Sequence, residues 1–378
     1  MNNCECKENY YRPVDQPWKC VPCNCDRLGA SSHTCSAQTG ACECRLGVLG
    51  RSCDKCSNQF AEVTLKGCEI LGSEQCPRSN FEGVEWDRIG YGKKQSSSCP
   101  DGSAGNAYRE CTQLGWSRPN LDHCLSNAFR ELHRFNEALY QNDRKLSTSK
   151  AVDLAEHLYL TLNESEGLYG ADINVTYGLI LKNLKFQNMQ DGYSLSMTSD
   201  EQFSTNLLKS SGKMIEMDKE YWDAIGPNSS IDLLNALSKY GEIIASNLPN
   251  TYTEIIKVNS GDNLSFLAIN GTNGQIRPNE DVKVFFDVSP RVKRAATVFT
   301  SKRMAQLLPL RFAPEKKGFK IPPHPVINSA IISIALYENF TLVTTIPNSP
   351  ILIRFALLES IGRSRAQCVF WSRDLDAW

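Results

Sequence analysis

Cysteine is distributed very unevenly along this chain of 378 residues, and this feature restricts its fold most. Fifteen of the 16 cysteines lie between Cys4 and Cys124, and the remaining one, Cys368, stands near the end. Small modules with too few apolar residues for a stable core are stapled by disulfides, which persist only in oxidising compartments. The first third therefore predicts disulfide-rich modules of a protein made in the secretory pathway.

A cytosolic zinc protein is the alternative that such cysteines raise. The pair Cys53 and Cys56 has a spacing that suits zinc, but no second pair follows at zinc-ribbon spacing and no histidine pair completes a finger. Six glycosylation sequons, all after the cysteine-rich part, favour a glycoprotein instead: Asn163, Asn174, Asn228, Asn263, Asn270 and Asn339. The 41 basic and 42 acidic residues nearly balance, which gives no reason to propose nucleic acid as a partner.

We find no targeting or membrane-spanning segment in the sequence. Met1 is followed by polar residues rather than by the apolar region of a signal peptide. The most apolar stretch, 326–337, is shorter than the ~20 residues that a helix needs to cross a bilayer. We therefore expect a fragment of a longer secreted or cell-surface protein.

After Cys124 the chain shows two successive periodicities. Between 126 and 250, apolar residues recur at helical spacing, as Ala151, Leu154 and Leu158 do. From about 251 the period becomes two, as where Val282 and Val284 flank a lysine. Further strands are expected at 251–258, 264–269, 327–337, 340–346 and 351–357. A helical half is thus predicted to precede a β-sandwich half.

The cysteine spacing resembles known extracellular modules. The eight cysteines from Cys23 to Cys68, with turn-forming glycines between them, resemble a laminin-type EGF module, and residues 6–20 resemble the closing loop of a preceding module of that kind. Cys76, Cys99, Cys111 and Cys124, with Trp86 and Trp116, resemble a hormone-receptor domain. These resemblances imply the pairs Cys6–Cys20, Cys23–Cys35, Cys25–Cys42, Cys44–Cys53, Cys56–Cys68, Cys76–Cys111 and Cys99–Cys124, and they leave Cys4 and Cys368 unpaired in this chain.

The order of the parts carries a resemblance over essentially the whole chain. A helical half, a β half and then Cys368-Val369-Phe370-Trp371 resemble the GAIN domain of adhesion G-protein-coupled receptors, which is closed by the GPS motif. With the preceding modules, and with residues 6–11, 58–64, 105–107 and 355–359, the chain resembles the membrane-proximal part of the seven-pass cadherins of the Flamingo type. The predicted parts are 1–22 and 23–70 (laminin EGF), 71–125 (hormone receptor), 126–250 (GAIN helical subdomain) and 251–378 (GAIN β-sandwich with the start of the GPS motif).

This resemblance implies a receptor on the extracellular side of the cell membrane that acts in cell–cell adhesion and planar cell polarity signalling. Its expected partners are other cell-surface or matrix proteins. Homophilic adhesion would use cadherin repeats, which bind calcium, and a heterotrimeric G protein would bind a seven-helix domain; both parts lie outside these residues. No cofactor and no metal are expected in this segment. The alternative is a secreted extracellular-matrix glycoprotein with laminin-EGF modules, against which the hormone-receptor module and the α-then-β order argue.

Two kinds of chain cleavage are raised by the sequence. GAIN domains cut themselves at a tripeptide whose hydroxyl or thiol attacks the preceding carbonyl. That tripeptide would lie beyond Trp378, so we expect no catalysis here, and we expect an unpaired strand edge with apolar surface and low stability. Separately, Arg291, Lys293 and Arg294 fit a proprotein-convertase site, for which a solvated basic loop is the alternative.

Overall fold

The computed structural model describes residues 6–70, 72, 74–141, 146–188, 197–247, 254–261, 263–270, 275–279, 282–285, 294–312, 324–338, 341–343, 351–359, 367–372 and 377–378. Contacts divide the chain into two compact units. The first comprises Met1–Asn127 with Tyr169–Ala171, and the second comprises Ala128–Leu168 with Asp172–Trp378.

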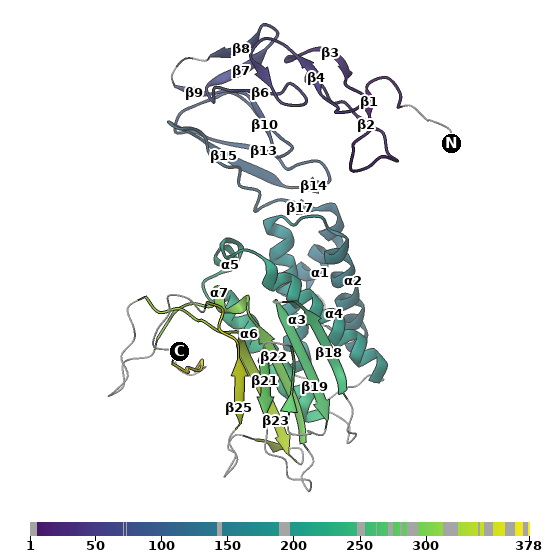
Figure 1. The fold of residues 1–378 in the computed structure, drawn as a ribbon, viewed down its shortest axis with the longest axis vertical. Helices are drawn as coiled ribbons and strands as arrows, with labels where there is room; N and C mark the ends of the chain where they lie inside the picture. Colours follow the sequence, from purple (N-terminus) through teal and green to yellow (C-terminus); the bar gives the residue numbers. More distant parts are fainter. Residues whose placement is uncertain are drawn as a thin grey trace. The chain divides into compact units, whose positions relative to one another are not determined.

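The first unit consists of short antiparallel strands (Figure 1). Its laminin-EGF part pairs β1 with β2, β3 with β4, β5 with β6 and β7 with β8. These strands are Tyr10–Tyr11, Val21–Pro22, Ala30–Cys35, Cys42–Cys44, Val48–Leu49, Lys55–Cys56, Ala61–Thr64 and Gly67–Ile70. Three of the five residues in its small buried core, Cys23, Cys42 and Cys53, are disulfide-bonded cysteines, so covalent bonds replace much of the apolar core.

The hormone-receptor part of this unit contains a three-stranded sheet in the order β13-β15-β16 and the pairs β9–β12, β10–β11 and β14–β17. Its strands, β9 to β17, are Gln75–Cys76, Ser79–Phe81, Val84–Trp86, Ile89–Gly90, Lys94–Ser98, Ser103–Ala104, Asn106–Thr112, Gly115–Trp116 and Leu125–Ser126. Val84, Trp86, Ala107 and Cys124 form its buried core.

The second unit begins with helices. They are α1 (Arg130–Tyr140), α2 (Thr148–Glu164), α3 (Gly170–Asn188), α4 (Met197–Glu216), α5 (Lys219–Ile225) and α6 (Ser229–Asn247), and the short 3₁₀ turn Asn127–Phe129 precedes α1. The apolar stripe of α2 is buried as its spacing predicts, and its members are Ala151, Leu154, Ala155, Leu158 and Leu162.

Two sheets follow the helices. The larger has the order β18-β19-β22-β23-β24, with strands Glu254–Ser260, Leu264–Asn270, Arg294–Ser301, Ile331–Glu338 and Thr341–Leu342. The smaller has the order β20-β21-β25, with strands Gln275–Ile276, Val282–Phe285 and Leu352–Phe355, and the short helix α7 spans Met304–Leu307. Val298 of the larger sheet and Val284 of the smaller sheet belong to one buried cluster, so the two sheets pack face to face as a sandwich.

Helix α6 covers the other face of the larger sheet (Figure 1). Thr297 of β22 donates its hydroxyl to the carbonyl of Gly241 at 2.8 Å. A Cβ added at Gly241 would lie 3.0 Å from that hydroxyl oxygen, so the glycine lets the helix approach the sheet closely. Thr297 points to the helix while its neighbours Ala296 and Val298 point into the sandwich, as the alternation of a strand requires.

The predicted fold class is confirmed: disulfide-rich modules precede an α+β domain whose helices come before its sandwich. Element ends differ in places. The strand expected from 327 begins at Ile331, because its partner β22 ends at Ser301, opposite that residue. The strand expected at 351–357 spans only Leu352–Phe355. Of the strand expected at 340–346, Thr341–Leu342 is formed, while 340 and 344–346 lie outside the described residues.

Candidate functional site

The outer strand β25 of the smaller sheet presents an exposed surface. All four of its residues are exposed. It pairs with β21 so that Val282 lies opposite Phe355 and Val284 opposite Ile353. Residues directly opposite on neighbouring strands point to the same face of a sheet. Ile353 and Phe355 therefore point to the core side, where both valines are fully buried, yet they are 37% and 38% exposed.

Two features make β25 a candidate acceptor for another strand. Within the described residues, no strand is bonded to its outer side, so a row of backbone donors and acceptors is available there. The apolar surface continues beyond the strand through Leu357 and Leu358, which are 51% and 36% exposed. We call Leu352–Phe355 the acceptor edge; Leu357 and Leu358 extend its apolar surface, but their backbone is already paired with Ser329 and Asn328.

Asn328 holds the far end of the acceptor edge in place. Its side-chain oxygen accepts the backbone N–H of Glu359 at 2.6 Å, and its side-chain nitrogen donates to the carbonyl of Glu359 at 2.8 Å. The backbone N–H of Leu358 donates to the carbonyl of Asn328 at 3.1 Å. These bonds fix the direction of the chain after β25, so the edge is an ordered surface.

The segment that resembles the start of the GPS motif is anchored by two tryptophans. The rings of Trp371 and Trp378 meet edge to face with centroids 5.2 Å apart. The indole N–H of Trp378 donates to the carbonyl of Pro309 at 3.1 Å, and its backbone N–H donates to the carbonyl of Arg311 at 2.8 Å. Cys368, just before them, is exposed and has no disulfide partner among the described residues, whereas Cys4 lies outside that part of the chain.

In the hormone-receptor part, a buried arginine is stacked among aromatic rings. The guanidinium carbon of Arg109 lies 5.0 Å from the ring centroids of Phe81 and Trp116 and 5.7 Å from that of Trp86. Its Nε donates to the carbonyl of Ser117 at 2.6 Å. Burial lowers the pKa of Arg109, and the charge of Glu82 opposes this shift. The cluster organises a module that has little other core.

Sequence reasoning did not single out Arg109. A signal for it exists, because Ala107, Arg109 and Cys111 alternate along β15 and all point inward. An arginine on the inward face of a strand needs a partner, and the two tryptophans already noted in this module supply it.

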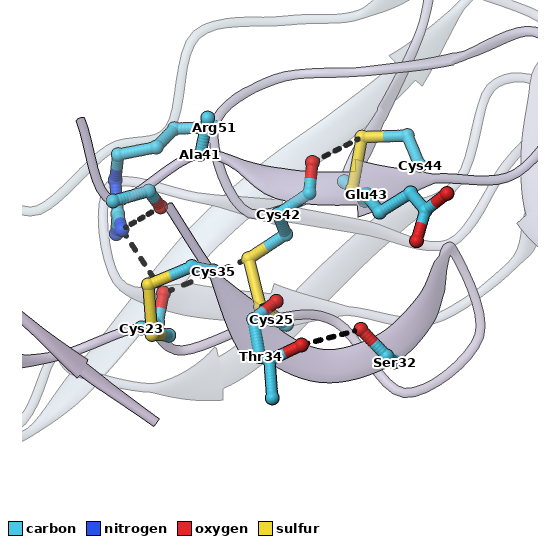
Figure 2. The surroundings of a disulfide bond; sticks show 12 residues. Cys23, Cys25, Ser32, Thr34, Cys35, Ala41, Cys42, Glu43, Cys44 and Arg51 are labelled. Carbon is cyan, nitrogen blue, oxygen red and sulfur yellow. Dashed lines mark hydrogen bonds between the residues drawn. A yellow bond between two sulfur atoms is a disulfide. The ribbon is translucent and has the colours of Figure 1, made fainter. Parts of the chain in front are cut away.

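The structure joins fourteen cysteines in seven disulfides. They are the same pairs that the resemblance to laminin-EGF and hormone-receptor modules implies. Figure 2 shows the laminin-EGF core, where Cys25 and Cys42 are bonded beside Cys23 and Cys35. The Nη1 atom of Arg51 donates to the carbonyls of Cys23 and Gly40, both at 3.0 Å, and so ties the loop ends together.

The sequons differ in how the structure presents their asparagines. Asn163, Asn174 and Asn228 are exposed, and Asn263 is half-buried. The side-chain oxygen of Asn228 accepts a hydrogen bond from Arg311 at 2.9 Å. The side chain of Asn270 and all of Asn339 lie outside the described residues.

The basic motif stands next to a strand in the middle of a sheet. Arg291 and Lys293 lie outside the described residues, and Arg294 is the first residue of β22. The residue after it, Ala295, is paired with Asn270 on one side and with Tyr337 on the other. The peptide bond that a convertase would cut is therefore held inside the larger sheet.

Metal-binding clusters and membrane-spanning helices are absent from the described parts of the chain. There, no cluster of three or more His, Cys, Asp or Glu side chains is arranged to hold a metal ion. In the same residues, no helix has the length and apolarity required to span a bilayer.

Comparison with known families matches successive segments of the chain from residue 23 onward. Residues 23–76 match the laminin EGF domain and 73–127 match the hormone receptor domain. Residues 129–245 match the profile described as AGRL2-4 GAIN subdomain A, and 245–378 match GAIN subdomain B, the GPS family. GAIN and GPS domains mark the ectodomains of adhesion receptors, so a laminin-like matrix glycoprotein is not favoured.

Curated proteins agree over nearly the whole chain. Cadherin EGF LAG seven-pass G-type receptor 2 of Rattus norvegicus is 30% identical over 98% of this chain. Receptor 2 of Homo sapiens is 30% identical over 96%, and receptor 1 of Mus musculus is 29% identical over 99%. The chain is a homologue of the cadherin EGF LAG seven-pass G-type receptors. It spans 22%, 16% and 14% of the lengths of these three relatives, so it corresponds to a minor part of such a receptor.

Proposed function

We propose that this seven-pass cadherin homologue lies at the cell surface, in the extracellular region of a receptor for cell–cell adhesion and planar cell polarity signalling. The set of matched domains and the similarity to named receptors support this role. The disulfides and the exposed sequons suit an extracellular site. In this role, other cell-surface or matrix proteins bind the receptor from outside, and parts beyond these residues supply homophilic adhesion and G-protein coupling.

The observation that carries our proposal for the sandwich is the exposed core side of the acceptor edge. We propose that this edge receives one more strand of the receptor's own chain, supplied after the GPS segment. Such a strand would satisfy the backbone groups of β25 and would cover Ile353 and Phe355. The GAIN domain would then hold together the extracellular part and the part that leads to the membrane.

Self-cleavage belongs to this proposal in a restricted form. We assign no catalytic residue to this chain, and any cut at a GPS tripeptide would use residues outside it. The role proposed for these residues is to hold the strand that adjoins such a site. This is a structural role, and it is the same whether or not the receptor cuts itself.

Variants on the two faces of β25, made in the full-length receptor, test the proposal. Ile353→Asp and Phe355→Asp place a charge on the core side, whereas Leu352→Asp places the same charge on the opposite face of the strand. We expect the first two variants to reduce the amount of receptor at the cell surface several-fold, measured by surface biotinylation, and the third to leave it near the unmodified level. Equal surface amounts for all three would overturn the acceptor role.

A further inference from the structure

Within the first unit, an aromatic side chain crosses each of the two junctions between modules. At the first junction, Tyr11 extends from the loop closed by Cys6 and Cys20 onto the next module. The ring of Tyr11 packs directly against Gly40, because a Cβ added at Gly40 would lie only 2.5 Å from the Cζ atom of Tyr11. The guanidinium of Arg51 stacks over the same ring at 5.2 Å.

The second junction lies between two different kinds of module and has an aromatic pair. Phe60 lies in the loop closed by Cys56 and Cys68, and its ring meets Tyr91 of the hormone-receptor module edge to face at 6.4 Å. Next to it, Gln59 contacts Gly115, where an added Cβ would lie 3.5 Å from the side-chain oxygen of Gln59. An aromatic residue near the start of a closing disulfide loop thus contacts the following module at both junctions.

An ion pair strengthens the second junction. Oε2 of Glu62 accepts hydrogen bonds from Nε and Nη2 of Arg88 at 2.9 and 2.6 Å. The Glu62 side chain is only 14% exposed, while that of Arg88 is 49% exposed. A charge-assisted pair with two donors on one half-buried carboxylate is geometrically specific, unlike most surface ion pairs. Removal of Arg88 would leave the Glu62 carboxylate poorly solvated and without this partner.

The covalent connection at this junction is also short. β8 ends at Ile70 and β9 begins at Gln75, and β9 pairs at once with β12, next to Tyr91. The backbone N–H of Tyr91 donates to the carbonyl of Glu74 at 3.0 Å, so the connecting chain is itself bonded to the second module. Domains that move freely make few contacts with each other, whereas several contacts of described residues cross this junction.

We propose that the laminin-EGF and hormone-receptor modules form one rigid recognition body, locked by Glu62–Arg88 and Phe60–Tyr91. A protein that binds either module then fixes the orientation of the other, and a binding surface can extend across both. This inference concerns the first unit alone and does not depend on the acceptor edge of the sandwich. The competing description is two independent modules joined by an exposed ion pair of little consequence.

Hydrogen exchange of the whole chain, read in the module that does not carry the mutation, separates these descriptions. In Arg88→Glu we expect amides of residues 58–64, in the laminin-EGF module, to exchange at least about fivefold faster. In Glu62→Arg we expect the same for residues 88–92, in the hormone-receptor module. The charge-swapped double variant should restore most of the protection in both segments. Arg78→Glu is the matched control, because Arg78 pairs with Asp87 inside the hormone-receptor module in a bridge whose side chains are 61% and 76% exposed.

Each outcome decides for or against the rigid body. Faster exchange across the junction, reversed by the swap, supports it. No change across the junction overturns it, and so does an effect confined to the mutated module or a swap that fails to restore protection. Arg88→Glu could unfold its own module, which would be seen as loss of protection in β13 and β15. In that case the milder variants Phe60→Leu and Tyr91→Leu are used, and hydrogen exchange is again measured in the module that does not carry the mutation. Unchanged exchange across the junction in both of these variants likewise overturns the proposal.

Discussion

The arginine stacked in the hormone-receptor module gives the sharpest test of what stabilises that module. Arg109→Met keeps most of the length of the side chain but removes its charge and its donors. The variant loses the hydrogen bond to Ser117, and a bond from a charged donor contributes about 1.5 kcal/mol or more. It also loses three ring contacts, each contributing about 0.5–1 kcal/mol.

These losses are partly offset. Burial disfavours the charged guanidinium, as the lowered pKa of Arg109 indicates, and methionine does not carry this desolvation cost. We therefore expect a net destabilisation of about 2–3 kcal/mol, which corresponds to roughly a 30- to 150-fold change in the equilibrium for opening.

Hydrogen exchange of β13 and β15 measures this change locally, in the whole chain, without the signal of the other domains. Arg109→Ala should lose more protection than Arg109→Met, because it also leaves a cavity. Arg118→Met in the same module is the control, since Arg118 is exposed. The reasoning is refuted if Arg109→Met exchanges within about twofold of the unmodified chain while Arg109→Ala exchanges much faster. That pattern would mean that the volume of the side chain matters and its charge does not.

Four further outcomes are expected. Phe266 is 1% exposed and faces Gly241 of α6. Phe266→Ala should lower the unfolding free energy of the second unit by about 3–5 kcal/mol, measured by denaturant titration. A loss under about 1 kcal/mol would show that α6 does not pack there. Burial lowers the pKa of Lys182 from its ordinary 10.5 to about 8, and the charge of Glu137 opposes this shift. At a pH between these two pKa values the unfolded chain binds more protons than the folded chain, so stability rises with pH. Unfolding midpoints of the unmodified chain should therefore rise relative to those of Lys182→Met from pH 8 to 10, with free thiols blocked, and parallel midpoints would contradict this. The Arg294–Ala295 bond should resist furin and trypsin in the folded chain and be cut after denaturation, because Ala295 is paired on both sides; rapid cutting of the native chain would contradict the placement of β22. Chain secreted from mammalian cells should carry glycans at the exposed Asn163, Asn174 and Asn228, detected as Asn-to-Asp conversion after enzymatic release, and lack of conversion at all three would count against glycosylation.

Much of the fold follows from local signals in the sequence. The density of cysteines and the turn-forming glycines between them predict small stapled modules, while the pairing of those cysteines was implied only by the resemblance to known modules, because spacing alone leaves many connectivities open. The apolar stripe of α2 predicts a helix because it recurs with a period of about 3.6 residues. The alternation of Val282 and Val284 predicts a strand because it has a period of two. Both periods are defined by residues that are close together along the chain.

Other features depend on residues far apart in the chain, which no local pattern records. Tyr140 fits the apolar stripe of α1 but is 64% exposed, with its ring over the ammonium of Lys182 at 3.2 Å. Ile353 and Phe355 alternate as a buried strand would, yet they remain partly exposed because β25 lies at the outer side of its sheet. Sheet order is set by long-range pairing, so the acceptor edge could not be located from the period alone.

The sequence by itself therefore determined the kinds of module, their order and the resemblance to seven-pass cadherin receptors, since these depend on residue types and short spacings. The tertiary structure alone decided that Glu62 meets Arg88, that Arg109 is enclosed by three rings, and that the convertase-like motif runs into a central strand. The physical reason is the same in each case. Contacts across a junction or between strands depend on how separate segments pack, and the free energy of that packing is shared among residues that the sequence does not place side by side.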